Sequence, residues 1–370
     1  MRIGVLVLMA GRSAGGPETY EVEMLRALAS VDRRNEYVVY CTGHEGPRAI
    51  GVQQDNFRYH VLQPSSRAVS LSVTLPFRLV RDGIDLLHST FTPPPVAFTP
   101  EVLTMHCLSS FVHPEFYTPA IARRLNGLLR IGMRRARCVL CVSRSTADDV
   151  HQRFNVPRER LAVTYNGVGS DFHPVPIDEA RLRLREALNI DGPYALFLGK
   201  LEPRKNVMRL LEAFARFRRD TGSDTKLLLA GNRTAVTPSI GAQIERLGLA
   251  DAVVQPGYVP SGMLADLYSA ARMFLLPSLW EGFGIPIVEA MACGTPVLTS
   301  NVTCLPEIAG GAAVIVDPAS TSSIAEGLAQ LDGSDDLRRS LVARGFERAR
   351  QFSWKGSARE TLAAYERVMH

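Results

Sequence analysis

The chain has 370 residues, which is long for one hydrophobic core and comfortable for two domains. Apolar residues make up 46% of the sequence and charged residues 21%, the balance of a soluble globular protein. The formal charge of +5 is compatible with binding to anionic small molecules, nucleic acid or an acidic membrane surface, and it does not distinguish among these partners. The apolar run at 3–9 is too short to span a membrane and lacks a signal-peptide layout, so we expect a cytoplasmic protein.

Strand-like and helix-like segments alternate along the first half of the chain, which predicts βαβ units and a parallel sheet. The predicted strands are 3–9, 37–41, 86–88, 102–106 and 138–143, and the clearest helices are 18–30 and 120–136. The C-x-x-C of Cys138 and Cys141 lies in a predicted strand, where its two side chains would point to opposite faces. We therefore interpret the six cysteines as buried structural thiols rather than redox or metal sites.

The pattern changes at 171–192, a proline-containing stretch that is a candidate linker, and the alternation then restarts. The second half has predicted strands at 194–200, 226–232, 252–258 and 273–278 and predicted helices at 206–219, 238–248 and 261–271. Two similar halves predict two doubly wound domains facing across a cleft, with ligands beyond the C-terminal ends of the strands. Residues from 352 onward predict a final helix with Ser353 as its N-cap.

The strongest site signal is EGFGIPIVEAMACGTPVLTS at 281–300. Its glycines allow a tight turn with exposed backbone N–H groups, and Pro286 fits the first turn of a helix that ends at Gly294. Glu281 then lies in a loop after a strand, and Glu289 lies in an apolar helix. A partly buried carboxylate requires a hydrogen-bonding partner. The hydroxyl pair of a ribose and a nearby N–H or arginine are both suitable partners for Glu289.

Cations follow another apolar strand in GKLEPRKN, at 199–206. Lys200, Arg204 and Lys205, placed just before a helix, form either a phosphate site or a solvated basic turn. The glycine-rich stretch at 11–20 matches neither G-x-G-x-x-G nor a P-loop, which disfavours a nicotinamide dehydrogenase or an NTPase.

A catalytic metal site is not expected, because the sequence has no Asp-x-Asp pair and no dense cluster of histidine, cysteine and carboxylate residues. The stretch 119–138 contains six arginines and no acidic residue. It predicts either an amphipathic helix in peripheral contact with an anionic membrane, or a core-facing stripe with a solvated basic face.

E-G-F-G-I-P-I-V-E-A-M-A-C-G-T-P-V resembles the E-x7-E signature of the retaining glycosyltransferases of family 4, which have the GT-B fold. GKLEPRKN is similar to the phosphate-binding G-R-x-x-x-x-K-N segment of that family, and the resemblance extends to LLLAGN, VTYNGVGSDFHP and the terminal FSWKGSARETL. It implies an α/β protein with two Rossmann-like domains. These are an acceptor-binding domain at 1–175 and a nucleotide-sugar donor domain at 190–352, with a C-terminal helix at 353–370 that packs back toward the first domain.

The resemblance also implies roles for individual residues on the donor side. Glu289 would bind the ribose hydroxyls, and Glu281 would face the donor sugar as a catalytic residue. The backbone N–H groups of Phe283, Gly284 and Ile285 would surround the sugar hydroxyls and the phosphate.

The remaining implied roles concern the leaving group and the acceptor side. Lys205, with Lys200, would neutralise the leaving diphosphate. Gly15 and Gly16 would line the opposite wall near the donor phosphate and the acceptor, and His106 would contact the transferred sugar.

Three positions depart from the family pattern. Lys200 stands where arginine is usual, which keeps the charge and loses the bidentate fork. Cys107 stands where aspartate is common, so the acceptor side is expected to differ. Gly169 replaces a frequent aspartate, with Asp171 two residues later.

The resemblance implies a retaining, metal-independent transfer of a sugar from a nucleotide-diphosphate sugar to a hydroxyl of a glycan, lipid-linked or small-molecule acceptor. HSTFTPPP and LTMHCLSSFVHPEFY resemble segments of family members that use GDP-mannose, so we expect a mannosyltransferase-like enzyme. No cofactor other than the donor itself and no nucleic acid partner is expected. Two alternatives stay open, a GT-B nucleotide-sugar epimerase and a non-catalytic nucleotide-sugar-binding subunit.

Overall fold

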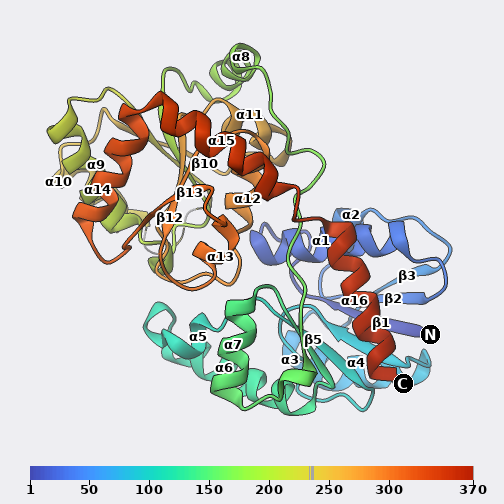
Figure 1. The fold of residues 1–370 in the computed structure, drawn as a ribbon. Helices are drawn as coiled ribbons and strands as arrows, with labels where there is room; N and C mark the ends of the chain where they lie inside the picture. The colour runs from blue at the N-terminus through green and yellow to red at the C-terminus, as the bar shows by residue number, and fades with distance from the viewer. Residues whose placement is uncertain (233, 235–236, 370) are drawn as a thin grey trace. The chain divides into compact units, whose positions relative to one another are not determined.

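The computed structural model describes residues 1–232, 234 and 237–369. The chain forms two compact units, of which the first comprises Met1–Gly167 with Ser353–His370 and the second comprises Val168–Phe352. In each unit helices cover both faces of a parallel β-sheet (Figure 1). The structure therefore confirms the predicted α/β class with two doubly wound, Rossmann-like sheets.

The first sheet has seven parallel strands in the order β3-β2-β1-β4-β5-β6-β7. The strands are β1 (Arg2–Val7), β2 (Glu36–Cys41), β3 (Phe57–Val61), β4 (Leu86–Ser89), β5 (Glu101–Met105), β6 (Cys138–Cys141) and β7 (Leu161–Val163). The strand order reverses between β1 and β4, which are neighbours. Ligands of doubly wound sheets bind beyond the C-terminal ends of the strands at such a point.

Helices cover both faces of this sheet (Figure 1). On one face lie α1 (Gly16–Val31), α2 (Gly46–Ile50) and α16 (Trp354–Met369), and on the other lie α3 (Arg67–Val69), the π-helical η1 (Ser70–Thr74), α4 (Leu75–Arg81), α6 (Pro119–Arg135) and α7 (Arg144–Phe154). The short elements α5 (Ser109–Val112), η2 (Pro114–Phe116) and η3 (Arg158–Arg160) lie between them in the chain. The faces follow from alternation along β4, because Leu87 packs in the core cluster of α4 whereas His88 contacts α16.

The C-terminal helix α16 packs on α1 and belongs to the first unit. The Ser353 hydroxyl accepts a hydrogen bond from the backbone N–H of Gly356 at 3.3 Å, which confirms the predicted N-cap. Further along the helix, the Tyr365 hydroxyl lies 2.6 Å from Nδ1 of His88, whose Nε2 lies 2.7 Å from the Thr104 hydroxyl. Burial lowers the pKa of His88 to about 3, so this buried network joins α16 to the sheet through neutral groups.

The second sheet has six parallel strands in the order β10-β9-β8-β11-β12-β13, which is the order of dinucleotide-binding folds. The strands are β8 (Tyr194–Leu198), β9 (Lys226–Ala230), β10 (Val253–Gly257), β11 (Met273–Leu276), β12 (Val297–Ser300) and β13 (Ala313–Val316). The helices are α8 (Ile177–Leu188), η4 (Pro203–Lys205), α9 (Val207–Thr221), α10 (Thr237–Arg246), η5 (Ser261–Met263), α11 (Leu264–Ser269), α12 (Ile285–Ala292), α13 (Leu305–Ala309), α14 (Thr321–Gly333) and α15 (Asp335–Ala349). The order reverses between β8 and β11.

The stretch 171–192, a candidate linker in the sequence, contains helix α8 of the second unit. Arg183 of α8 donates two hydrogen bonds to Asp266 of α11, at 2.9 and 2.6 Å, and this ion pair holds α8 on the second unit. The chain passes from one unit to the other between Gly167 and Val168.

The C-x-x-C residues are structural, as the strand interpretation predicts. Both lie in β6 and their side chains point to opposite faces. Cys141 packs in the core cluster beneath α6, and Cys138 accepts a hydrogen bond from Arg367 of α16 at 3.0 Å. All six cysteines are free thiols, and burial raises the pKa of Cys138 and of Cys141.

Candidate active site

Glu281 lies in the loop between β11 and α12, and its buried carboxylate is surrounded by donors. Lys205 donates to Oε1 at 2.5 Å, and the Ser278 hydroxyl donates to the same oxygen at 2.8 Å. Arg204 donates to Oε2 at 2.8 Å. The loop after β8 and the loop after β11 therefore meet through one carboxylate, at the point where the strand order reverses.

Charge keeps this buried carboxyl ionised. Burial by itself would raise the pKa of Glu281, but the charges of Lys205 and Arg204 and the hydrogen bonds from Lys205 and Ser278 outweigh burial and bring the pKa to about 2. Burial lowers the pKa of Lys205, and Glu281 opposes this effect. Glu281 therefore carries no proton at neutral pH, and it has no proton to give as a general acid.

Asn206 fixes the position of Lys205 relative to Glu281. Its φ of 63° starts α9, directly after the single turn that carries Lys205. Its side-chain amide donates to the carbonyl oxygens of Pro277 and Pro318, at 3.0 and 2.7 Å. The Lys205 turn is thus tied to the loop that leads to Glu281.

Glycines end the three strands on this side of the sheet. Gly199 follows β8 with a φ of 156°, Gly231 follows β9 with a φ of 139°, and Gly257 ends β10 with a φ of 78°. A Cβ atom on Gly231 would lie 1.9 Å from the carbonyl oxygen of Gly199. The loops after these strands consequently approach each other through backbone alone, and Lys200 lies partly exposed directly after Gly199.

The predicted phosphate-binding N–H groups lie where the sequence placed them, at the start of α12. Gly284 has a φ of 88° and precedes the first helical residue, Ile285. Phe283 is buried and its ring packs edge-on against Phe352, with the centroids 5.4 Å apart. The N-terminal end of α12, with its partial positive charge, therefore follows Glu281 by a few residues.

Glu289 lies one turn into α12 and is buried. The Tyr268 hydroxyl donates to its Oε2 at 2.9 Å, so a phenol supplies one of the partners that a buried carboxylate requires. Burial and the charge of Glu289 raise the pKa of Tyr268, which keeps this hydroxyl protonated. The Tyr268 hydroxyl is an uncharged donor, in contrast to the lysine and the arginine that contact Glu281.

The predicted residues of the first unit also lie together. Gly15, with a φ of 75°, caps α1, and Gly16 is the first residue of that helix. The ring of Tyr20 on α1 packs edge-on against His106, with the centroids 4.5 Å apart. His106 follows β5, so the contact with Tyr20 joins the first turns of α1 to the C-terminal end of a central strand.

The loop between β1 and α1 is held by two acidic residues that the sequence analysis did not single out, Glu18 and Glu21. Six of its backbone N–H groups donate to them, those of Leu8, Met9 and Ala10 to Glu21 and those of Gly11, Arg12 and Ala14 to Glu18. Glu21 also accepts from the hydroxyl of Thr90, which follows β4, at 2.7 Å. The two glutamates thus fix the glycine-rich loop, and Glu21 links it to the neighbouring strand end.

His106 is a neutral side chain with an assigned tautomer. Its Nε2 lies 2.8 Å from the carbonyl oxygen of Thr90, and a carbonyl oxygen only accepts, so Nε2 carries the proton. Nδ1 is then the acceptor atom of the ring. Burial lowers the pKa of His106 to about 4.

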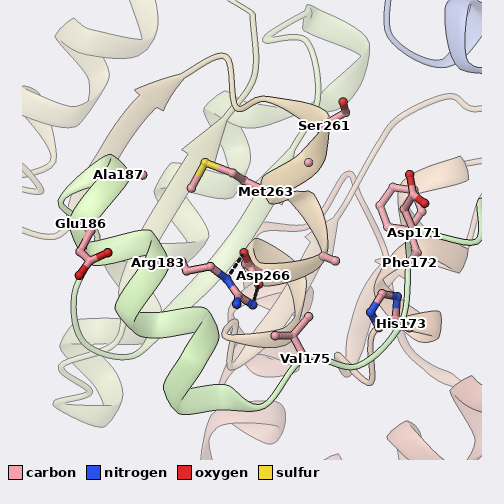
Figure 2. Close-up of a pocket in the computed structure, with 12 residues that line it drawn as sticks. Asp171, Phe172, His173, Val175, Arg183, Glu186, Ala187, Ser261, Met263 and Asp266 are labelled. Atoms are coloured by element: carbon pink, nitrogen blue, oxygen red, sulfur yellow. Dashed lines mark hydrogen bonds and ion pairs between the residues drawn. The ribbon is translucent and has the colours of Figure 1, made fainter.

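A separate pocket of the second unit lies away from these residues. This pocket of about 700 Å³ lies between residues 171–175, α8 and the start of α11, with the Arg183–Asp266 ion pair inside it (Figure 2). None of the predicted site residues lines this pocket. Among the residues that the structure describes, no three histidine, cysteine or acidic side chains lie close enough to hold a metal ion.

Two parallel, doubly wound sheets of this kind in one chain are the architecture of the GT-B fold. Residues 14–172 match the family model described as Glycosyltransferase Family 4, and residues 179–348 match the model Glycosyl transferases group 1. The chain belongs to glycosyltransferase family 4. This membership confirms the resemblance inferred from the E-x7-E stretch.

Similar proteins agree with this class. O-antigen chain mannosyltransferase B from Escherichia coli is 36% identical over 265 residues, which is 72% of this chain and 70% of that protein. The serotype-specific mannosyltransferase WbdA from Escherichia coli is 27% identical over 241 residues, and the match spans 64% of this chain and 29% of WbdA. The structure of HepE from Anabaena in complex with UDP and glucose has a TM-score of 0.80 at 20% identity, covering 99% of this chain and 100% of HepE.

Proposed function

We propose that this glycosyltransferase moves a hexose, mannose in the first instance, from a nucleotide-diphosphate sugar to an acceptor hydroxyl, with retention at the anomeric carbon. The observation that supports it most is the grouping of Lys205, Arg204, Glu281 and the start of α12 at the reversal point of the second sheet. The mannosyltransferase relative supports the sugar, and the HepE complex with UDP and glucose supports the class of donor.

In the proposed donor site, Lys205 and Lys200 neutralise the diphosphate as it leaves. The backbone N–H groups of Phe283, Gly284 and Ile285 contribute the positive end of α12. Fixed cations and dipoles stabilise a developing negative charge without reorganisation during the reaction. We infer that these groups take the place of a divalent metal, and we expect full activity in the presence of a chelator.

Glu289 is proposed to bind the ribose hydroxyls. Its carboxylate faces a neutral hydroxyl donor, Tyr268, and a ribose hydroxyl is a donor of the same kind. Exchange of one hydroxyl donor for another leaves the charge balance of the buried site unchanged.

Retention is proposed to proceed by attack on the face from which the diphosphate leaves. Glu281 is ionised, but two cations and a hydroxyl hold it and offset its negative charge, which makes it a poor nucleophile. The acceptor hydroxyl then gives its proton to a departing phosphate oxygen. His106, neutral and fixed through Nε2, offers Nδ1 as an acceptor to a hydroxyl of the transferred sugar, and Gly15 and Gly16 let the backbone approach donor phosphate and acceptor.

The acceptor is proposed to be a hydroxyl of a glycan, carried on a lipid or free, with peripheral contact between α6 and an anionic membrane. On α6, Leu129 and Met133 are buried while Arg123, Arg124 and Arg130 are exposed, so this helix presents charge outward, together with the exposed side chains of Ile121 and Ile131. No helix among the described residues is both long and apolar enough to cross a membrane.

The test is a panel of nucleotide sugars, assayed for nucleotide release and for the product glycoside with glycan and lipid-linked acceptors. Glu289→Ala should abolish nucleotide binding in calorimetry, whereas Glu326→Ala, an exposed glutamate on α14, should leave it unchanged. The proposal fails if no donor is turned over and Glu289→Ala binds nucleotide as the wild type does.

A further inference from the structure

The first unit carries an apolar stripe on its outer surface. Elements α3, η1 and α4 follow one another without a break, so residues 67–81 form one continuous helical segment. Val69, Val73, Phe77 and Val80 are 44%, 63%, 64% and 70% exposed. Their spacing of four, four and three residues places them on one side of a helix.

The opposite side of the same segment is apolar as well. Leu71, Leu75 and Leu79 are buried in the core cluster beneath β1 and β2. A helix on the surface of a soluble protein usually turns a polar face to water, and contiguous exposed apolar surface marks an interaction site.

The loop that precedes β5 also exposes an apolar side chain. Phe98 is 80% exposed, more than any other large apolar side chain that the structure describes. Its neighbour Ala97 packs against the core cluster that α4 also covers, which places this loop beside α4. The same loop meets α6, because Arg135 donates to the carbonyl oxygen of Pro94 at 2.8 Å. Segment 67–81, the loop and α6 therefore share one face of the first sheet (Figure 1).

The charge on this face is positive. Residues 57–81 contain four arginines and no aspartate or glutamate, and residues 119–138 contain six arginines and no acidic residue. A second copy of the chain on this face would set arginines against arginines, which disfavours self-association. An anionic bilayer provides negative headgroups and an apolar layer at once.

We propose that this face docks on an anionic lipid bilayer, with Phe77 and Phe98 entering the boundary of the acyl chains and the arginines of α6 lying among the headgroups. The inference adds an apolar contact to the electrostatic one of α6. It does not depend on the proposed sugar donor, because docking requires neither nucleotide nor turnover.

The experiment compares sedimentation of the full chain with vesicles of phosphatidylcholine alone and with vesicles that also contain phosphatidylglycerol. We expect binding to the anionic vesicles only, weakened by salt. Phe77→Ser combined with Phe98→Ser should weaken it about a hundredfold or more, because each buried phenylalanine contributes a factor of at least about ten. Leu182→Ser on α8 is the matched control, since Leu182 is 57% exposed on the second unit, and it should bind as the wild type does.

Thermal unfolding and nucleotide binding are measured on every variant and should not change, which separates docking from folding and from the proposed donor site. Equal binding to neutral and anionic vesicles, no binding to either, or undiminished binding of the double serine variant would each overturn the proposal. The wild type could instead form a dimer and fail to bind vesicles, while the double serine variant is a monomer. That result would overturn the proposal in favour of a second copy of the chain on this face.

Discussion

The ion pair between Lys205 and Glu281 should contribute a measurable coupling energy to the stability of the second unit. The pKa of Glu281 lies at about 2 instead of 4.5, so the folded protein favours the charged carboxylate. A difference of this size corresponds to about 3 kcal/mol. Arg204 and Ser278 share in this effect, so we expect a coupling of about 1–3 kcal/mol for the Lys205–Glu281 pair.

The perturbation is a double-mutant cycle of Lys205→Met, Glu281→Gln and the two combined. Lys205→Met leaves a buried carboxylate with one cation fewer and should cost about 3 kcal/mol. The double variant removes both charges and should cost less than the sum of the two single changes. Urea unfolding measures the cycle in a Trp354→Phe background. The chain has two tryptophans, so Trp280, next to Glu281, then reports on the second unit alone.

The same cycle predicts a pH dependence. Because the folded pKa of Glu281 is depressed, its stabilisation is present above about pH 4.5 and is lost as the pH falls toward 2. Glu281→Gln removes this part of the acid sensitivity. A coupling energy below about 0.5 kcal/mol, the usual limit of additivity, would refute the account of the pair.

Three further outcomes are expected. Gly231→Ala should destabilise the second unit by more than about 3 kcal/mol in urea unfolding, because its Cβ would lie 1.9 Å from a carbonyl oxygen; Gly262→Ala, which has open space, is the control, and equal stabilities would contradict the prediction. Tyr268→Phe should cost about 1–3 kcal/mol of stability in urea unfolding, because Glu289 loses a hydrogen bond, and it should not weaken nucleotide binding in calorimetry, because a ribose hydroxyl takes the place of the phenol; unchanged stability or weaker binding would contradict the exchange. In NMR titration His106 should stay neutral from pH 8 down to about 5 and protonate near 4, with stability falling as the pH drops below about 6.5; a midpoint near 6.5 would contradict this.

The sequence predicted the elements that have a strong local pattern. The helix α12 is an example, because Pro286 lies in its first turn and Gly294, with a φ of 77°, follows its end. The alternation of strands and helices predicted parallel sheets. The order of the strands within each sheet could not be predicted from the sequence, because it depends on packing between elements that are distant in the chain.

Elements without a clear alternation of apolar and polar residues were not predicted. Strands β3 and β7 lie at the edges of the first sheet and are only partly buried. The sequence of β3, FRYHV, has no apolar run, and β7, LAV, is only three residues long. Segment 67–81 is apolar on both sides, as Leu75 inside and Phe77 outside illustrate. A periodicity argument needs a broad polar face to set against the apolar one, and in this segment the polar residues, such as Thr74 and Arg78, form only a narrow stripe.

The hydrogen-bonding partners of the site residues could likewise not be predicted from the sequence. The motif predicted where Glu281 lies, but its hydrogen bonds with Lys205 and Arg204 join residues that are 76 and 77 positions apart. Glu18 and Glu21 stand one turn apart behind the glycine-rich loop. That spacing indicates a shared helix face, and only the folded loop reveals that this face binds backbone N–H groups.

The two carboxylates of the E-x7-E stretch accept from different donors, a phenol at Glu289 and two cations at Glu281, and these donors bear on the order of events at the donor site. Glu289 faces a neutral phenol and can exchange one hydroxyl donor for another at little electrostatic cost. Glu281 shares Lys205 with any phosphate that reaches the site, so a bound diphosphate and this carboxylate compete for the same cation. Before a donor binds, Glu281 keeps the buried ammonium charged and in place. We therefore expect the diphosphate to draw Lys205 from Glu281 and to leave that carboxylate with Arg204, Ser278 and the hydroxyls of the sugar.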